Sequence, residues 1–253
     1  MKRILFFFLL LASLVFPFEA ELEVKYLTFS NTEEHKYGIK RFIKLKENIF
    51  ALGFYEGTFK QKSGGKYHDG IIFLKGNLKN LSLGFMYMPY SVEVISSYAK
   101  GVNLTLKKER WNFAFYYTNL NFNLSVVQIS PSFEFSHKGI DFEIGTDLFY
   151  YDKKFVDGFI LPGKYLFAVK SGVSYKFLHV EAFVGNRLFS YEEGGFEFHS
   201  HPEKHLYGGK VKLSYEIKDF KFSGKFLLSF YRELESLRRA KVFGIGFSVE
   251  KEF

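Results

Sequence analysis

The residues best suited to metal chemistry lie together near position 200. The segment His199-Ser200-His201-Pro202-Glu203-Lys204-His205 carries three imidazoles, and three further glutamates come shortly before it. Imidazoles and carboxylates are common ligands of Zn²⁺ and other divalent metals. His199, His201 and His205 are therefore a weak candidate metal site. The favoured interpretation is an exposed polar loop, so we expect no metal and no other cofactor.

The sequence gives even less support for a nucleophilic catalytic site than for a metal site. Membrane-embedded hydrolases need a serine and a histidine on the same face of a strand, but Ser136-His137 and His199-Ser200 are sequence neighbours. Neighbouring residues of a strand point to opposite faces. The chain also has no cysteine, which excludes thiolate catalysis and disulfides. We expect no catalytic residues and no enzymatic activity, with a lipid hydrolase as a distant alternative.

The elements that position these residues are strands. Large apolar residues alternate with small or polar ones along the whole chain after residue 20, as in Leu81-Ser82-Leu83-Gly84-Phe85 and in Trp111-Asn112-Phe113-Ala114-Phe115. A period of two is typical of strands with two different faces. No part of this region has a convincing helical period, so the sequence predicts an all-β protein.

The connections between these strands alternate in length. We expect short turns at Glu47-Asn48, Lys79-Asn80, Lys108-Glu109, Lys138-Gly139, 177–179 and Lys218-Asp219, and longer loops at 30–35, 61–70, 89–97, 119–123, 151–163, 186–205 and 232–240. Six turns and seven loops join fourteen antiparallel strands and bring both chain ends to the side of the short turns. Bacterial outer-membrane barrels have even strand numbers, short periplasmic turns and long outer loops. Twelve strands is the alternative.

The number of large apolar residues indicates whether the apolar face of the barrel points inward or outward. The chain has 34 Phe and 17 Tyr, more than the interior of a closed barrel could hold. Lipid accepts apolar side chains on the outside, and barrel closure pairs every backbone group. The sequence predicts a lipid-facing set and a girdle set near the rims. The lipid-facing set is Phe85, Phe113, Phe115, Phe142, Phe222, Phe226 and Phe247, and the girdle set is Trp111, Tyr117, Tyr165, Tyr175, Tyr207 and Tyr215.

The C-terminal segment carries a resemblance to a known class. Phe243, Ile245, Phe247, Val249 and Phe253 share one face, and the chain ends on the aromatic. This resembles the C-terminal strand of Gram-negative outer-membrane β-barrel proteins, porins among them. The resemblance implies recognition by the barrel-assembly machinery and a place in the outer membrane of a diderm bacterium. Lys251 departs from the pattern and is expected at the headgroup level.

The face opposite the apolar residues would line a lumen, and its charges suggest a function. The expected lining residues are Lys40, Lys44, Glu134, Asp141, Glu143, Asp147, Lys170, Lys176, Glu181, Lys210, Lys212, Lys221 and Lys225. Lysines outnumber carboxylates and the signs are partly segregated around the wall, which favours a porin-like channel for passive diffusion of small hydrophilic solutes with a mild anion preference. A non-conducting structural barrel that acts through its loops is the alternative.

The first twenty residues resemble an export signal. Lys2 and Arg3 precede an apolar run, and Ala20 offers a small residue at which cleavage would occur. We therefore expect a signal peptide over residues 1–20, a barrel over residues 21–253 and export through the inner membrane, with outer-membrane lipid as the surrounding partner. The net charge of +8 does not indicate nucleic-acid binding, because the lysines alternate with apolar residues instead of clustering.

Overall fold

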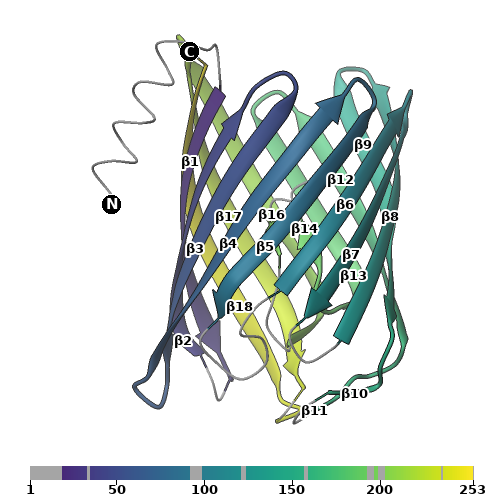
Figure 1. Cartoon of the computed structure of the whole chain (residues 1–253). Coiled ribbons are helices and arrows are strands. Elements are labelled where there is room, and N and C mark those ends of the chain that lie inside the picture. Colours follow the sequence, from purple (N-terminus) through teal and green to yellow (C-terminus); the bar gives the residue numbers. More distant parts are fainter. Residues whose placement is uncertain are drawn as a thin grey trace.

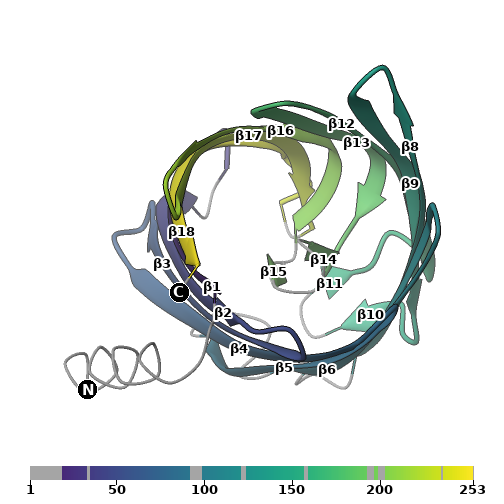
Figure 2. The same ribbon diagram turned by 90° about the horizontal axis from the view of Figure 1, so that it is seen from above.

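The computed structural model describes residues 19–32, 35–91, 99–120, 124–156, 159–192, 197–198, 203–234 and 236–252. Fourteen strands close into one barrel (Figures 1 and 2). They are β1 (Glu19–Ser30), β2 (His35–Lys46), β3 (Phe50–Gln61), β4 (Lys66–Leu78), β5 (Leu81–Ser91), β6 (Ala99–Lys108), β7 (Trp111–Leu120), β8 (Leu124–His137), β9 (Ile140–Tyr151), β12 (Tyr165–Tyr175), β13 (Leu178–Arg187), β16 (Glu203–Ile217), β17 (Phe220–Glu233) and β18 (Arg239–Glu252).

The barrel is a meander that closes on itself. Each barrel strand pairs antiparallel with the preceding and following barrel strands, and β1 also pairs with β18, where Glu19 lies opposite Glu252. This confirms the predicted closed antiparallel barrel and decides for fourteen strands instead of twelve. Across the described residues, no helix is long and apolar enough to cross a membrane.

The short turns gather at one rim and the long loops at the other (Figure 1). Five of the six short turns hold a residue at positive φ: Lys79, Glu109, Lys138, Lys176 and Lys218. A left-handed residue in a short turn matches the twist of the two strands that it joins. The C-terminal end of β18 lies opposite the start of β1 at this same rim, as the alternating connection lengths predicted.

Three of the long connections differ from the expected loops. The connection expected at 61–70 is reduced to 62–65, because β3 and β4 continue to pair as far as Lys60 and Lys66. The connection between β9 and β12 contains a short hairpin, β10 (Phe155–Val156) and β11 (Phe159–Ile160). The connection between β13 and β16 contains another, β14 (Tyr191–Glu192) and β15 (Glu197–Phe198).

The large apolar residues face outward, as predicted. Phe85 and Phe247 are 51% and 54% exposed, whereas phenylalanine is usually buried in a water-soluble protein. Phe113, Phe115 and Phe226 are also exposed, while Phe142 and Phe222 are half-buried. All six residues of the girdle set are exposed: Trp111, Tyr117, Tyr165, Tyr175, Tyr207 and Tyr215. An exterior with so many exposed aromatic residues excludes a water-soluble barrel.

Arginine substitutions on the outer face test whether this face contacts lipid, because their cost in unfolding free energy depends on depth in the bilayer. Phe226→Arg, near the middle of β17, should lower the free energy of unfolding in lipid vesicles by about 2–4 kcal/mol, because the charge enters hydrocarbon. Tyr215→Arg, close to the turn between β16 and β17, should cost only about 0–1 kcal/mol. Urea titration of both variants measures the difference. Equal costs at the two positions would contradict a lipid-facing surface.

Candidate functional site: a narrowed lumen

The chain after β13 turns into the barrel and narrows its interior (Figure 2). The Tyr191 ring stacks on Tyr116 of β7 with a centroid separation of 4.6 Å and an interplanar angle of 13°. Thr118 donates a hydrogen bond to the Tyr191 hydroxyl at 2.8 Å, and the Tyr191 backbone N–H donates to Gln128 Oε1 at 2.8 Å. We call residues 188–192 the constriction segment, because these contacts fix it against the inside of β7 and β8.

Apolar packing holds the same segment from the other side. Leu188 and Phe189 are each 1% exposed, and Tyr151 of β9 donates a hydrogen bond to the Leu188 carbonyl at 2.7 Å. Both belong to an apolar cluster with Leu161, from the connection between β9 and β12, and with inward residues of β3 to β9. The inner side of β3 to β9 is therefore covered by a packed apolar core, which the charged residues expected in the lumen did not predict.

One glycine of the wall makes room for this packing. A β-carbon on Gly101 of β6 would collide with the Tyr191 hydroxyl. Glycine inside a strand is unfavourable unless a close approach requires it. Here the close approach is that of the constriction segment.

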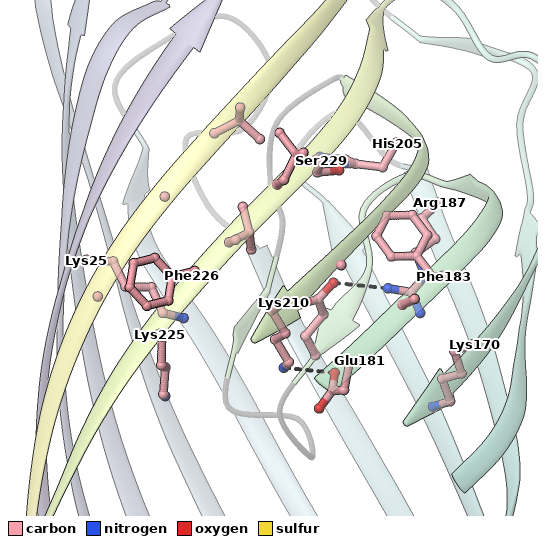
Figure 3. A pocket seen from close by; sticks show the side chains of 18 of the residues that line it. Lys25, Lys170, Glu181, Phe183, Arg187, His205, Lys210, Lys225, Phe226 and Ser229 are labelled. Carbon is pink, nitrogen blue, oxygen red and sulfur yellow. Dashed lines mark hydrogen bonds and ion pairs between the residues drawn. The ribbon is translucent and has the colours of Figure 1, made fainter. Parts of the chain in front are cut away.

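A cavity of about 310 Å³ remains between the constriction segment and the opposite wall (Figure 3). This wall is formed mainly by β1, β9, β12, β13, β16, β17 and β18. Among the described residues, six cationic and five acidic side chains line it: Lys25, Lys40, Lys170, Arg187, Lys210 and Lys225, with Glu143, Asp147, Glu181, Glu192 and Glu203. The free part of the lumen is thus strongly charged and nearly balanced in sign.

Arg187 connects the constriction segment to the wall. Its guanidinium lies 2.5 Å from Asp147 Oδ2 on β9 and 3.2 Å from Glu192 Oε1, and it covers the Phe183 ring at 4.1 Å. Asp147 is 3% exposed and has Lys170 Nζ at 3.5 Å as a second cation. A buried carboxylate needs such partners, because an unpaired charge is very costly inside a protein.

The charges of the wall are paired across neighbouring strands or, for Lys225 and Glu23, across the intervening β18. Lys225 Nζ lies 2.6 Å from Glu23 of β1, and Lys44 lies 3.5 Å from Glu21 of the same strand. Lys170 contacts Asp147, and Lys210 contacts Glu181 at 3.1 Å. The expected separation of signs into opposed walls is therefore wrong. The register places lysines and carboxylates next to one another.

Sequence reasoning missed the carboxylates of β1. Glu19, Glu21 and Glu23 alternate with Leu22 and Val24, and the latter two are more than half exposed on the outer face. The period of two was present in the sequence and would have found them. Only Glu19 falls within the expected signal peptide of residues 1–20, whereas Glu21 and Glu23 follow it and were not assigned to the lumen.

A second group that sequence analysis missed is a row of hydrogen-bonded side chains formed by Ser174, His179 and Glu181. Ser174 Oγ lies 2.7 Å from His179 Nδ1, and Glu181 Oε1 lies 2.7 Å from His179 Nε2. Serine hydrolases use the opposite order, with serine on Nε2 and the acid on Nδ1. Glu181 also pairs with Lys210 (Figure 3). The set therefore fits a charge-paired lumen wall better than a nucleophilic site.

Most of the residues expected to line a lumen lie on strand faces that point inward. By the alternation of each strand they are Lys40, Lys44, Glu134, Asp141, Glu143, Asp147, Lys170, Glu181, Lys210, Lys212, Lys221 and Lys225. Lys176 is different. It lies in the turn after β12 with φ 51°, and its amine is 5.1 Å from the outward Tyr175 ring. Lys107, which we did not predict, joins the inner face through Glu134 at 2.8 Å.

The candidate metal ligands do not form a site in the described part of the chain. His199 and His201 lie outside the described residues. His205 Nδ1 is 2.7 Å from Ser229 Oγ, and its Nε2 is 3.9 Å from Glu203, whose other oxygen is 3.3 Å from His35. Among the described residues, no group of three or more His, Asp or Glu side chains could hold a metal ion. These side chains instead connect β2 to β16 at the long-loop rim.

No family model matches the chain, and no curated protein matches it. Among solved structures, it is similar to the Acinetobacter baumannii outer membrane protein Omp33, with a TM-score of 0.53, 10% identity, and coverage of 94% of this chain and 99% of that one. Pseudomonas aeruginosa OccK8 (OprE) gives a TM-score of 0.44 at 9% identity, with 94% and 98% covered. With its closed meander, its apolar exterior and its charged lumen, the chain has the porin-like β-barrel fold of Gram-negative outer-membrane proteins.

Proposed function

We propose that the chain is an outer-membrane channel for the passive diffusion of small hydrophilic solutes, with a mild anion preference. The observation that carries the proposal is the charged cavity beside the constriction segment, inside a barrel whose apolar residues face outward. Charged rings at a narrow point select solutes by sign, while an interior filled by side chains would have no charged free space.

The anion preference is small because most charges are paired. In the described part of the cavity wall, six cations face five carboxylates, and ion pairs such as Lys225–Glu23 at 2.6 Å reduce the field of each partner. With Glu23 counted beside Lys225, the described charges at the cavity balance, so the proposed preference for anions rests on the inward lysines of β16, Lys210 and Lys212. Salt screens such a field within about 8 Å at physiological ionic strength, so the selectivity should fall as salt rises.

Single-channel recording of the folded protein in a planar bilayer tests the proposal. Discrete conductance steps with a reversal potential on the anion side are expected. Folded protein that inserts without conducting would contradict the channel. That result would favour the alternative, a structural barrel that acts through its long loops.

The inward lysines of β16 provide the test of selectivity. Replacing Lys210 and Lys212 by Glu should move the reversal potential toward cations without unfolding the barrel, because both are half-buried on the inner face. Lys176→Glu is the matched control, since Lys176 lies in a turn against Tyr175. An unchanged reversal potential in the double variant would reject Lys210 and Lys212 as lining residues while leaving the channel in place.

We also propose that residues 1–20 are a signal peptide and that β18 is the strand recognised by the barrel-assembly machinery. Phe243, Ile245 and Phe247 are 43–54% exposed on the outer face of β18, Val249 is half-buried, and Phe253 lies outside the described residues. The mass of the protein purified from outer membranes should correspond to a chain that begins at Glu21. A mass that retains Ala20 or Glu19 would refute this cleavage site.

A further inference from the structure

Four cations lie close together on the outer surface of the barrel at the long-loop rim. Lys204 of β16 is directly opposite Arg232 of β17, and Arg232 is directly opposite Arg239 of β18. Lys241 lies two residues further along β18, on the same face as Arg239. We call Lys204, Arg232, Arg239 and Lys241 the rim quartet.

The neighbours of the rim quartet show that it points away from the lumen. Glu203, Tyr231, Glu233 and Ala240 are all buried, with at most 7% of each residue exposed. Each is adjacent in sequence to a member of the quartet. Successive side chains of a strand point to opposite faces, so the four cations lie on the outer face.

This arrangement is unfavourable without a counterion. Like charges directly opposite one another on neighbouring strands destabilise a sheet, and here three cations stand in one row across three strands. The Nε of Arg232 is also buried without a hydrogen-bond partner among the described residues. A bound anion would remove the repulsion and supply the missing acceptor.

The depth of the rim quartet indicates which anion is available. The outward residues of β17 run through Phe226, Leu228 and Phe230 before they reach Arg232. Phe230 stacks on Tyr207 of β16 with a centroid separation of 4.6 Å. The cations therefore begin where the aromatic girdle ends, at the level of lipid headgroups. The long-loop rim of such barrels faces the outer leaflet.

We propose that the rim quartet is a binding site for the phosphate groups of an outer-leaflet lipid. Guanidinium groups bind phosphate oxygens with paired hydrogen bonds, and lysines add positive charge. Two arginines and two lysines on adjacent strands can hold more than one phosphate of a single headgroup. The proposal rests on the outer-membrane orientation of the barrel and does not depend on whether the lumen conducts.

A lone cation at the same rim provides the matched control. Lys100 of β6 is exposed on the outer face, but the residues opposite it are Tyr87 and Asn119. A single lysine at this level needs no ligand, because it can extend its amine into water.

Native mass spectrometry of the full folded chain in detergent tests the site, with diphosphoryl lipid A as the probe. The parent protein should retain the lipid, and the combined Lys204→Gln, Arg232→Gln, Arg239→Gln and Lys241→Gln variant should retain it about tenfold less or weaker still, given the attraction of several basic groups for anionic lipid. Lys100→Gln should bind like the parent. Heat-dependent migration in gels verifies folding. If the fourfold variant does not fold, the double variant with Arg232→Gln and Arg239→Gln replaces it in the binding measurement.

Three outcomes would overturn the proposal. The folded variant could bind lipid A as well as the parent does, or the parent could retain lipid A equally well after both phosphates were removed. An excess of inorganic phosphate could also displace the lipid, which would indicate a site for soluble anions. A barrel that binds the lipid without conducting would refute only the channel. A conducting barrel that fails to bind would refute only the rim site.

Discussion

Arg187→Met should lower the free energy of unfolding by about 3 kcal/mol, at the low end of the cost of breaking a buried ion pair. The physical reason is Asp147, which is 3% exposed and would lose the guanidinium at 2.5 Å. Lys170 at 3.5 Å would still compensate part of its charge, which keeps the cost from being larger. Urea titration of the barrel in lipid vesicles measures the change.

Two further variants separate this effect from general damage to the lumen. Lys107→Met breaks a pair with Glu134 whose side chains are 55% and 41% exposed, so its cost should stay within about 1 kcal/mol. Adding Asp147→Asn to Arg187→Met should recover part of the lost stability, because no uncompensated carboxylate remains. An Arg187→Met protein as stable as its parent would show that the pair is solvated and the lumen more open than the structure indicates.

Releasing the constriction segment should increase the conductance. Combining Leu188→Ser with Tyr191→Ala removes the buried leucine, the ring stacked at 4.6 Å on Tyr116 and the hydroxyl bonded to Thr118. The segment would then lose its side-chain contacts to β7 and the packing of Leu188, and only backbone hydrogen bonds such as those to Tyr151 and Gln128 would still hold it. We expect the single-channel conductance to rise by roughly twofold or more, because the narrowest part of a pore limits ion flow.

The matched control for this experiment is Tyr165→Ala. Tyr165 is 75% exposed on the outer face of β12, so its removal should leave the conductance unchanged. If the double variant folds and conducts like its parent, the constriction segment does not limit flow, and the passage must lie elsewhere in the lumen.

The sequence by itself determined the barrel and its two faces. A strand repeats every two residues, so the alternation around Phe85 and Phe115 fixed which side chains would share a surface. The large excess of aromatic residues then required a lipid exterior. The alternation of short turns and long loops determined the strand number and the rim at which the ends meet, because antiparallel neighbours reverse direction at every connection. These features are local or additive, and a sequence displays them directly.

Only the tertiary structure decided what fills the lumen. The pairing of Lys170 with Asp147 and of Lys225 with Glu23 depends on the register between strands, and a shift in register changes every cross-strand partner. Lys176 lies outside the lumen, contrary to expectation, because it belongs to the turn after β12. Tyr191 enters the barrel because Tyr116, Thr118 and Gln128, more than sixty residues earlier in the chain, are arranged to receive it. The rim quartet likewise became visible only when the registers of the hairpins β16–β17 and β17–β18 were known. These arrangements depend on strand register, on turn geometry or on residues far apart in the chain, so the alternation of apolar and polar residues alone does not encode them.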